Sequence, residues 1–89
     1  MPVTPAEAKA LADARGYALS GRVDFSGHAR ERMTQRGIKK QDVYSAFRTA
    51  WTCASQPENR WKVIGNDADG DALEVVIRFE DGVMVVTVY

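Results

Sequence analysis

The stretch richest in reactive side chains runs from residue 25 to residue 38, F-S-G-H-A-R-E-R-M-T-Q-R-G-I, and holds the only histidine of the chain. On a helix, which turns about 100° per residue, Arg32 falls about 40° from His28 and Arg36 about 80° from it. The three side chains therefore share one side of the helix. Glu31 is the only acid in the stretch, so this side is strongly basic.

A histidine beside two arginines is suited to phosphate chemistry. His28 stands near the start of the helix, where unpaired N–H groups and the helix dipole favour anions and disfavour an imidazolium ion. A neutral imidazole can move protons while Arg32 and Arg36 stabilise the charge that develops at phosphorus. The structural alternative is that His28 helps to cap the helix and that Arg32 pairs with Asp24 or Asp42. Both interpretations stay open at this point.

Metal and cofactor chemistry has little support. The acid-rich segment 66–71 resembles a calcium loop, but with Gly70 in the sixth position Gly65 and Val76 take the first and twelfth, where acids are required. One histidine and one cysteine make other metal sites equally poor. A glycine-rich phosphate loop, a nucleophile elbow and a helical carboxylate pair are all missing from the sequence. We predict no metal and no cofactor.

Composition indicates one globular domain. The hydrophobic fraction is 45% and the charged fraction 27% in 89 residues, which leaves room for one modest core. No window approaches the ~20 apolar residues of a membrane span, and the N-terminus has no hydrophobic signal core, so we expect a cytoplasmic protein. Cys53 is the only cysteine and is expected to be a semi-buried helical residue, since it has no partner for a disulfide.

The charge is neutral overall but unevenly distributed. Residues 22–48 carry seven bases and three acids, or +4, whereas residues 49–89 carry three bases and seven acids, or −4. This pattern predicts a basic surface on the central helices, with the acids of the C-terminal half mostly in turns. Random scatter in a small protein is the alternative.

Three helices are expected in the N-terminal part of the chain, before the predicted sheet strands at 60–89. The first has Thr4 as cap, Pro5 at its first position and Glu7 to close a capping box, and it stops at Gly16. Its thin alanine-rich face suggests a helix on the outside of the domain or a partner-binding appendage. The second helix runs from a Ser26 cap to Gly37. The third carries an apolar stripe typical of a packed helix, formed by Val43, Ala46, Phe47 and Ala50.

The remainder predicts an antiparallel meander. Strands are expected at 60–65, 72–79 and 83–89, and 22–25 has weak strand character. A two-residue Asp81-Gly82 turn would set Phe79 opposite Met84, Ile77 opposite Val86 and Val75 opposite Val88, an apolar face. If Ile64 lies opposite Ala72, Trp61 and Val63 join that face. The other face then carries Arg60, Lys62, Glu74, Val76, Arg78, Val85, Thr87 and Tyr89. The expected class is α+β, with N-terminal helices on one face of the meander.

Thr87 and Tyr89 end the last strand on the polar face. A phenol there can stack on a base or donate to a phosphate oxygen, as in RNA-binding sheets. The alternative is an ordinary strand end with a partly exposed tyrosine. The helices must cover the apolar face, so these two residues can meet His28 only at an edge or an end of the sheet.

These motifs together resemble a known family. The run H-A-R-E-R-M-T-Q-R-G-I at 28–38, D-V at 42–43, R-W-K-V-I-G at 60–65 and V-V-T-V-Y at 85–89 resemble a family of small bacterial proteins of unknown function that is grouped with the RelE and BrnT toxins. The resemblance covers residues 25–89. It implies a fold of the barnase-EndoU-colicin-RelE type, metal-independent RNA cleavage and pairing with an antitoxin protein.

The resulting hypothesis is a single domain, 1–89, with a RelE-like core at 22–89 and a possible appendage at 1–16. It would act as a toxin-like endoribonuclease on RNA, including ribosome-bound mRNA. The expected catalytic residues are His28, Arg32, Arg36 and Tyr89, and the expected substrate-binding residues are Arg30, Arg60, Lys62, Arg78 and Thr87. The alternatives are a non-catalytic adaptor of the same fold that binds nucleic acid or protein, and a small regulator that docks through its first helix.

Overall fold

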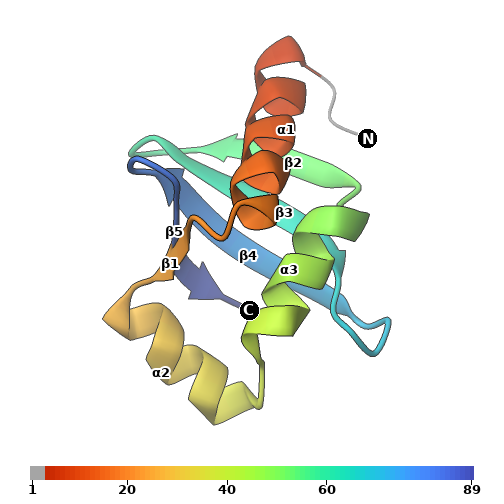
Figure 1. Ribbon diagram of the computed structural model, residues 1–89, viewed down its shortest axis with the longest axis vertical. Coiled ribbons are helices and arrows are strands. Elements are labelled where there is room, and N and C mark those ends of the chain that lie inside the picture. Colours follow the sequence, from red (N-terminus) through yellow and green to blue (C-terminus); the bar gives the residue numbers. More distant parts are fainter. Residues whose placement is uncertain (1–3) are drawn as a thin grey trace.

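Three helices and a five-stranded sheet make up the protein, for which a computed structural model describes residues 4–89 (Figure 1). The strand order is β1-β5-β4-β3-β2, in which β1 is parallel to β5 and the other neighbours are antiparallel. The α+β class and the meander are confirmed. In chain order the elements are α1 (Pro5–Leu19), β1 (Val23–Phe25), α2 (Gly27–Arg36), α3 (Lys40–Thr49), β2 (Thr52–Gln56), β3 (Arg60–Asn66), β4 (Ala72–Phe79) and β5 (Val83–Val88).

Helix α1 begins as predicted but ends later. The Thr4 hydroxyl accepts the N–H of Glu7 at 3.1 Å and the Glu7 carboxylate accepts the N–H of Thr4 at 3.2 Å, which completes the capping box. The predicted end at Gly16 is wrong, because the helix continues to Leu19. Tyr17, just beyond the glycine, packs against the core, and such burial outweighs the cost of about 1 kcal/mol for a glycine inside a helix.

The sheet has one more strand at each edge than the three-stranded meander that was predicted. The weak strand signal at 22–25 corresponds to β1, which pairs with β5 from Val23–Val83 to Phe25–Val85. Strand β2 was not predicted, because Thr52–Gln56 consists of small and polar residues without apolar alternation. Its existence depends on pairing with β3, which a local pattern does not reveal.

The turn between β4 and β5 differs from the predicted two-residue turn. Phe79 pairs with Val83, so the loop spans three residues, 80–82. Asp81 has φ 52°, in the left-handed region that aspartate tolerates better than most residues. Gly82 has φ 131°, which a glycine adopts without strain. The predicted pairing of Phe79 with Met84 is therefore wrong by one residue at this end of the hairpin.

A bulge in β5 restores the predicted register farther along. Ile77 pairs with Val85 but Val76 pairs with Thr87, which leaves Val86 as the extra residue. Val85 consequently lies in the core, fully buried, and not on the polar face. Met84 and Val86 lose their predicted core positions for the same reason. Beyond the bulge, Val75 pairs with Val88 as predicted, and Thr87 keeps the outer face.

The register of β3 against β4 is shifted by two residues from the prediction. Ile64 pairs with Glu74 and not with Ala72. A shift of two leaves the faces unchanged, because side chains alternate with period two. Val63 is accordingly buried, and Lys62 lies on the outer face of the sheet, as predicted.

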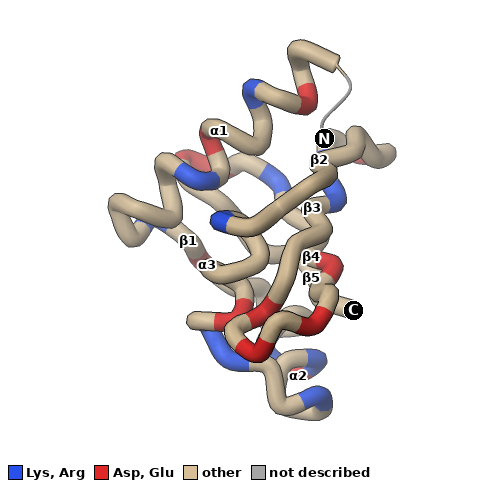
Figure 2. Tube along the Cα trace, turned by 90° about the vertical axis from the view of Figure 1, so that its right-hand side faces the viewer, with Lys and Arg blue, Asp and Glu red and all other residues tan. Residues whose placement is uncertain are grey.

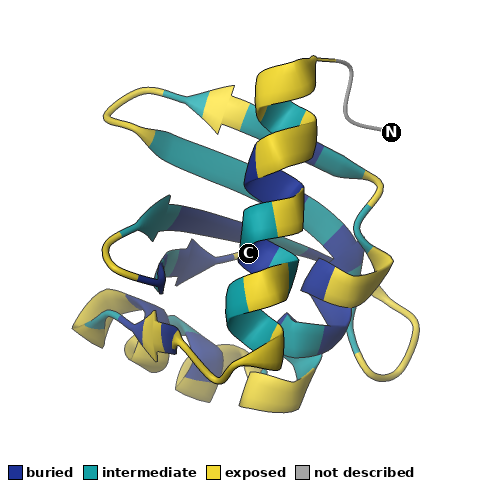
Figure 3. Ribbon diagram, turned by 45° about the horizontal axis from the view of Figure 1, so that its top comes forward, coloured by how far each residue is buried: buried dark blue, intermediate teal, exposed yellow. Residues whose placement is uncertain are grey.

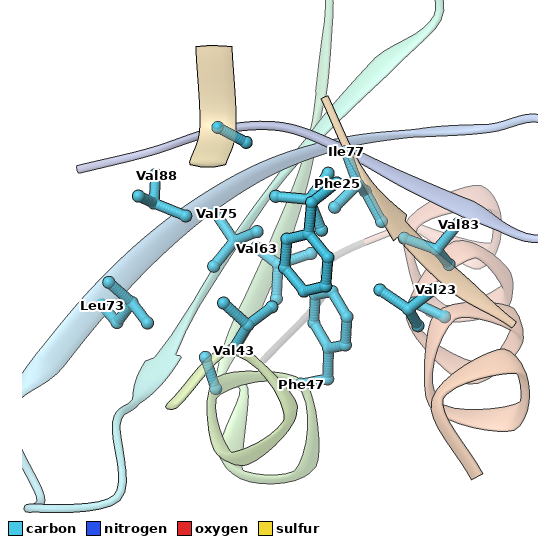
Figure 4. Packing of buried hydrophobic residues seen from close by; sticks show 14 of the residues in the cluster. Val23, Phe25, Val43, Phe47, Val63, Leu73, Val75, Ile77, Val83 and Val88 are labelled. Carbon is cyan, nitrogen blue, oxygen red and sulfur yellow. The ribbon is translucent and has the colours of Figure 1, made fainter. Parts of the chain in front are cut away.

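One core lies between the helices and the inner face of the sheet. Helix α3 contributes Val43, Ala46 and Phe47, each at most 1% exposed, which confirms the predicted stripe. Figure 4 shows Val43, Phe47 and Phe25 directed at valines and an isoleucine of the sheet. Exposed residues lie on the outer sides of the helices (Figure 3). The face of the sheet opposite the helices carries the predicted polar residues.

Helix α1 shares this core. Ala10, Leu11 and Ala14 are buried in the same cluster as Phe47, and α1 contacts α3, β2 and β5. The Arg15 guanidinium further donates to the carbonyl of Phe47 at 2.8 Å. The first helix is therefore packed as part of the domain.

Candidate functional site

Helix α2 is tied to strand β5 at its N-cap residue, Ser26. The Ser26 hydroxyl oxygen accepts the N–H of Ala29 at 3.0 Å and its O–H donates to the carbonyl of Val86 at 2.9 Å. The Ser26 N–H donates to the carbonyl of Val85 at 3.0 Å. Gly37 ends the helix with φ 67°, the left-handed cap that glycine favours. Both predicted caps are confirmed, and the helix starts at the bulge of β5.

Helix α2 therefore lies along the part of β5 that β1 leaves open. Strand β1 pairs with β5 only from Val83 to Val85, and α2 contacts β5 beyond it (Figure 1). The inner side of the helix, Ala29 and Met33, is buried in the core. Because α2 lies at the sheet edge, the side chains next to this buried side of the helix can reach the outer face of the sheet. The position of α2 at the sheet edge therefore lets a residue of this helix contact the residues at the end of β5.

Arg32 and Tyr89 meet at this edge. The ζ-carbon of Arg32 lies 5.3 Å from the centroid of the Tyr89 ring, a cation–π contact of about 0.5–2 kcal/mol. The Arg32 Nε is buried and makes no hydrogen bond within the described residues. Tyr89 is 48% exposed, and its N–H donates to the carbonyl of Glu74 at 2.9 Å. The ring is thus anchored through its backbone and open on part of its surface.

His28 and Arg36 extend the same flank of α2, one turn before and one turn after Arg32. Both are exposed, and neither side chain makes a hydrogen bond or an ion pair with a residue of the range 4–89. Their side chains are free to contact a solute. The structure thus brings Arg32 together with Tyr89, and helical spacing keeps His28 next to them.

The alternative interpretation, in which His28 caps the helix and Arg32 pairs with an aspartate, does not agree with the structure. Arg32 lies over Tyr89 and forms no ion pair with Asp24 or Asp42. The Asp42 carboxylate instead accepts the N–H groups of Lys39 at 2.8 Å and Ala68 at 3.0 Å. These bonds, the one from Lys39 first, lower the pKa of Asp42. The helix cap belongs to Ser26, so His28 has no capping role.

Thr87 is a buried polar residue on the outer face of the sheet. It is 6% exposed, and its Oγ1 makes no hydrogen bond with any described residue. Strand alternation places Thr87 and Tyr89 on the same face, since Val88 between them points into the core. Buried hydroxyls usually have a partner, so Thr87 is an exception among the described residues, and an incoming group could reach its oxygen only if the surrounding side chains moved.

The predicted substrate-binding residues divide into separate groups. Lys62 and Thr87 both pair with Val76, so their backbones lie two strand spacings apart, about 10 Å. Arg60 and Arg78 also lie on the outer face but form ion pairs, Arg60 with Glu58 at 3.4 Å and Arg78 with Glu80. Of the three cations on the outer face of the sheet, Arg60, Lys62 and Arg78, only Lys62 has no ion pair within the described chain.

Arg30 lies away from this group. Two residues on a helix are about 200° apart, so Arg30 points about 160° away from Arg32. It lines a hollow of about 280 Å³ together with Lys39 and Lys40. These two lysines were not among the site residues predicted from the sequence. Their signal was two adjacent lysines that follow the glycine at the end of α2 after a single residue, Ile38.

The other polar and apolar features lie elsewhere. A groove of about 220 Å³ between α1 and α3 is lined by Leu19, Tyr44 and Phe47 among others and contains none of the predicted catalytic residues. Cys53 lies fully buried in β2, so the prediction of a semi-buried helical cysteine is wrong. Burial raises the pKa of its thiol to about 11. Within residues 4–89, no three His, Cys, Asp or Glu side chains converge as metal ligands do.

Charge is segregated over the molecule. Figure 2 shows Lys and Arg at the end formed by α2, and Asp and Glu in the loop between β3 and β4. That loop is held by Asp67, whose Oδ1 accepts the N–H groups of Asp69 and Asp71 at 2.9 Å each. The expectation of basic central helices and acidic turns agrees with this arrangement. An anion would approach the α2 end more favourably than the loop.

Fold and site together define an α+β protein with a basic helix set against the edge of a five-stranded sheet. The chain belongs to the family described as Domain of unknown function (DUF4258), whose profile matches residues 25–89. The match includes α2, α3 and strands β2 to β5, and it leaves out α1. No curated protein and no solved structure gives a significant match to the chain. None of the helices in residues 4–89 has the length and apolarity needed to cross a bilayer.

Proposed function

We propose that this protein is a metal-independent endoribonuclease whose site lies on the exposed flank of α2. The observation that carries the proposal is the contact of Arg32 with Tyr89, one turn from His28. It brings a proton-transfer group, a guanidinium and an aromatic ring from two distant parts of the chain onto one surface. Such a set is suited to an RNA phosphodiester with an adjacent base.

In the proposed reaction the ribose 2′-OH attacks the adjacent phosphorus. His28 takes the proton of the 2′-OH, the bond from phosphorus to the 5′-oxygen breaks, and that oxygen receives a proton from water, after which the protonated His28 returns its proton to the solvent. The products are a 2′,3′-cyclic phosphate and a 5′-hydroxyl. Arg32 and Arg36 stabilise the negative charge that develops on the phosphoryl oxygens. Because the nucleophile belongs to the substrate, the protein needs only acid–base and electrostatic groups.

Tyr89 and Thr87 would position the substrate. The exposed part of the Tyr89 ring offers a stacking surface, and base–aromatic stacking contributes about 1–3 kcal/mol per base. Thr87 lies on the same face, but its hydroxyl is buried, so a bond to a phosphate or sugar oxygen would require the neighbouring side chains to move. Lys62, about 10 Å away across the sheet, would contact the strand farther along.

A non-catalytic binding module is the second candidate, and one observation favours it. His28 has no described neighbour that bonds to its ring, whereas a catalytic base is commonly oriented by a third group. A binding module would use the same cations without turnover. Its affinity for RNA would still fall steeply with salt, because neutralised phosphates release counterions.

The proposal includes a toxin-like role. The motifs at 28–38 and 85–89 resemble proteins grouped with RelE and BrnT toxins, and that resemblance suggests a cytoplasmic toxin held by a cognate antitoxin protein. Ribosome-bound mRNA is then a possible substrate besides free RNA. An operon partner that binds the protein and suppresses cleavage would support this part of the proposal.

The test is cleavage of mixed-sequence RNA in EDTA by the wild type and by His28→Ala and Arg32→Ala. We expect the wild type to cleave and His28→Ala to lose about 10²- to 10⁴-fold in rate, the range of general acid–base catalysis. Arg48→Ala, an exposed arginine on α3, is the control and should cleave normally. Circular dichroism checks that each variant is folded.

Each other outcome has a defined meaning. A folded His28→Ala protein with the wild-type rate would remove His28 from the mechanism. Binding of RNA without cleavage, with and without ribosomes, would favour the binding module. Cleavage that requires added Mg²⁺ would contradict the metal-independent reaction.

A further inference from the structure

A hollow of about 280 Å³ opens on the side of α2 that faces away from His28. Its walls come from β1, α2, the turn after α2 and the start of α3. The residues that matter here are Phe25, Arg30, Met33, Ile38, Lys39 and Lys40. Phe25 and Met33 are buried and form an apolar floor, and the three cations stand at the rim.

The cations at this rim are not neutralised. Arg30, Lys39 and Lys40 are exposed and form no ion pair with a residue of the described range. Lys40 Nζ lies 5.7 Å from the centroid of the Phe25 ring, so this ammonium group is held over the hollow. Three like charges around one depression repel each other, and an anion placed among them relieves that repulsion.

Asp42, the acid nearest in sequence to the two lysines, does not cancel this charge. Both oxygens of the Asp42 carboxylate accept backbone N–H groups, Oδ2 that of Lys39 and Oδ1 that of Ala68. The carboxylate thus faces the β3–β4 loop and the backbone of the turn. No acidic residue of the described chain lines the hollow.

The hollow and the His28 flank lie on opposite sides of one helix. Arg30 and Arg32 point about 160° apart, and a helix with its side chains is about 10–12 Å across. A flexible RNA strand can bridge that distance around the exposed end or outer side of α2. Contacts on both sides would hold the strand against the helix and fix which phosphate meets His28.

We propose that this hollow binds backbone phosphates of the same RNA strand whose scissile phosphate lies at the His28 flank. This inference rests on the proposed function for its substrate, and it adds a second contact surface made of Arg30, Lys39 and Lys40. The apolar floor suits the edge of a ribose or base next to the bound phosphate. Sequence is not read here, because phosphate contacts position a strand without discriminating its bases.

Substrate length follows from this arrangement. A dinucleotide can occupy the His28 flank but cannot reach the hollow as well. The wild type should therefore cleave a longer oligonucleotide better than a dinucleotide. That preference should shrink when the lysines of the hollow are neutralised.

The test measures binding of a short 2′-O-methyl oligouridine, which has no free 2′-OH and is not cleaved by the proposed reaction. The logarithm of its affinity is followed against the logarithm of salt concentration for wild type, Lys39→Gln/Lys40→Gln and a matched control, Lys9→Gln/Arg48→Gln. Single-stranded binding loses about 0.7 in slope per phosphate contact removed. We expect a slope lower by about 1.4 for the hollow variant and an unchanged slope for the control.

The outcomes separate this inference from the proposed function. Equal slopes for all three proteins, or an equal drop in both variants, would overturn the inference, as would a wild type that does not bind the probe. Cleavage that depends on His28 but not on Lys39 and Lys40 would leave the ribonuclease standing without the hollow. Binding that depends on the hollow, without cleavage of ordinary RNA, would support the hollow and refute the enzyme.

Discussion

Arg32 joins two parts of the chain that are 57 positions apart, the second helix and Tyr89, the residue that follows β5. Its Nε is buried while its charge lies against an aromatic ring. A guanidinium is planar and weakly hydrated, so it stacks on a ring at low desolvation cost. A lysine at this position would lose the planar contact and the fork of donors. Arg32 is therefore the residue on which the geometry of the site depends.

The ring of Tyr89 is predicted to matter more than its hydroxyl for RNA binding. Tyr89→Leu removes the stacking surface and should weaken binding of the uncleavable oligouridine by about 1–3 kcal/mol, the value of one base stack. Tyr89→Phe keeps the ring and should bind within a few-fold of the wild type. Fluorescence anisotropy measures both. An equal loss in the two variants would assign the effect to the phenol.

Cys53 is predicted to be inert in the folded protein. Burial raises its pKa to about 11, and the thiolate is the reactive form. Iodoacetamide at about pH 8 should therefore label the folded chain far more slowly than the chain in urea, as followed by mass spectrometry. Labelling should rise as pH approaches 11, provided the fold persists. Rapid alkylation at neutral pH under folding conditions would show that β2 opens readily.

At the scale of elements, α3 packs closely against β3 at Gly65. A Cβ placed on Gly65 would lie 2.0 Å from the carbonyl oxygen of Ala46, so the helix can pack here only because the strand has no side chain. This proximity lets Phe47 reach into the core beside the sheet. Gly65 is therefore needed so that α3 can pack against β3, and it does not mark a turn.

Gly65→Ala is accordingly predicted to destabilise the protein by about 1–3 kcal/mol, the usual cost of overpacking. Gly16→Ala is the matched control, because nothing lies within 4 Å of its added Cβ and the residue is inside α1. It should stabilise by about 0.5–1 kcal/mol. Urea unfolding measures both changes. A neutral Gly65→Ala would mean that α3 can move away from the sheet at little cost.

At the scale of the whole molecule, α1 lies outside the family match but inside the core. The match begins at Phe25, whereas Ala10, Leu11 and Ala14 are buried with Phe47. Removing the helix would expose the apolar surface of α3 and β2 that it covers. A small domain has little stability to spare for such a loss.

A chain that starts at Gly21 is therefore predicted to unfold at lower urea concentration than the full chain, or to aggregate. The physical reason is the exposure of the surface around Phe47 and Cys53. Urea unfolding and size-exclusion chromatography give the answer. Wild-type stability in the shortened chain would instead support the interpretation of residues 1–16 as an appendage.

Local features were predictable from the sequence because their causes are local. The caps at Thr4, Ser26 and Gly37 depend on hydrogen bonds and backbone conformations within a few residues. The stripe of α3 and the meander follow from periodicity, and the two faces of β3 survived a register error of two residues because side chains alternate. The basic flank of α2 also follows from helical spacing alone.

Only the tertiary structure decided the features that depend on distant partners. Helix α1 passes Gly16 because Tyr17 packs against the core, β2 exists because β3 pairs with it, and the bulge at Val86 moves Val85 inward. The position of α2 along the open edge of β5 brings Arg32 to Tyr89 and leaves Arg30 over a separate hollow. These contacts join residues far apart in the chain, and their free energies come from burial and pairing that no local pattern contains.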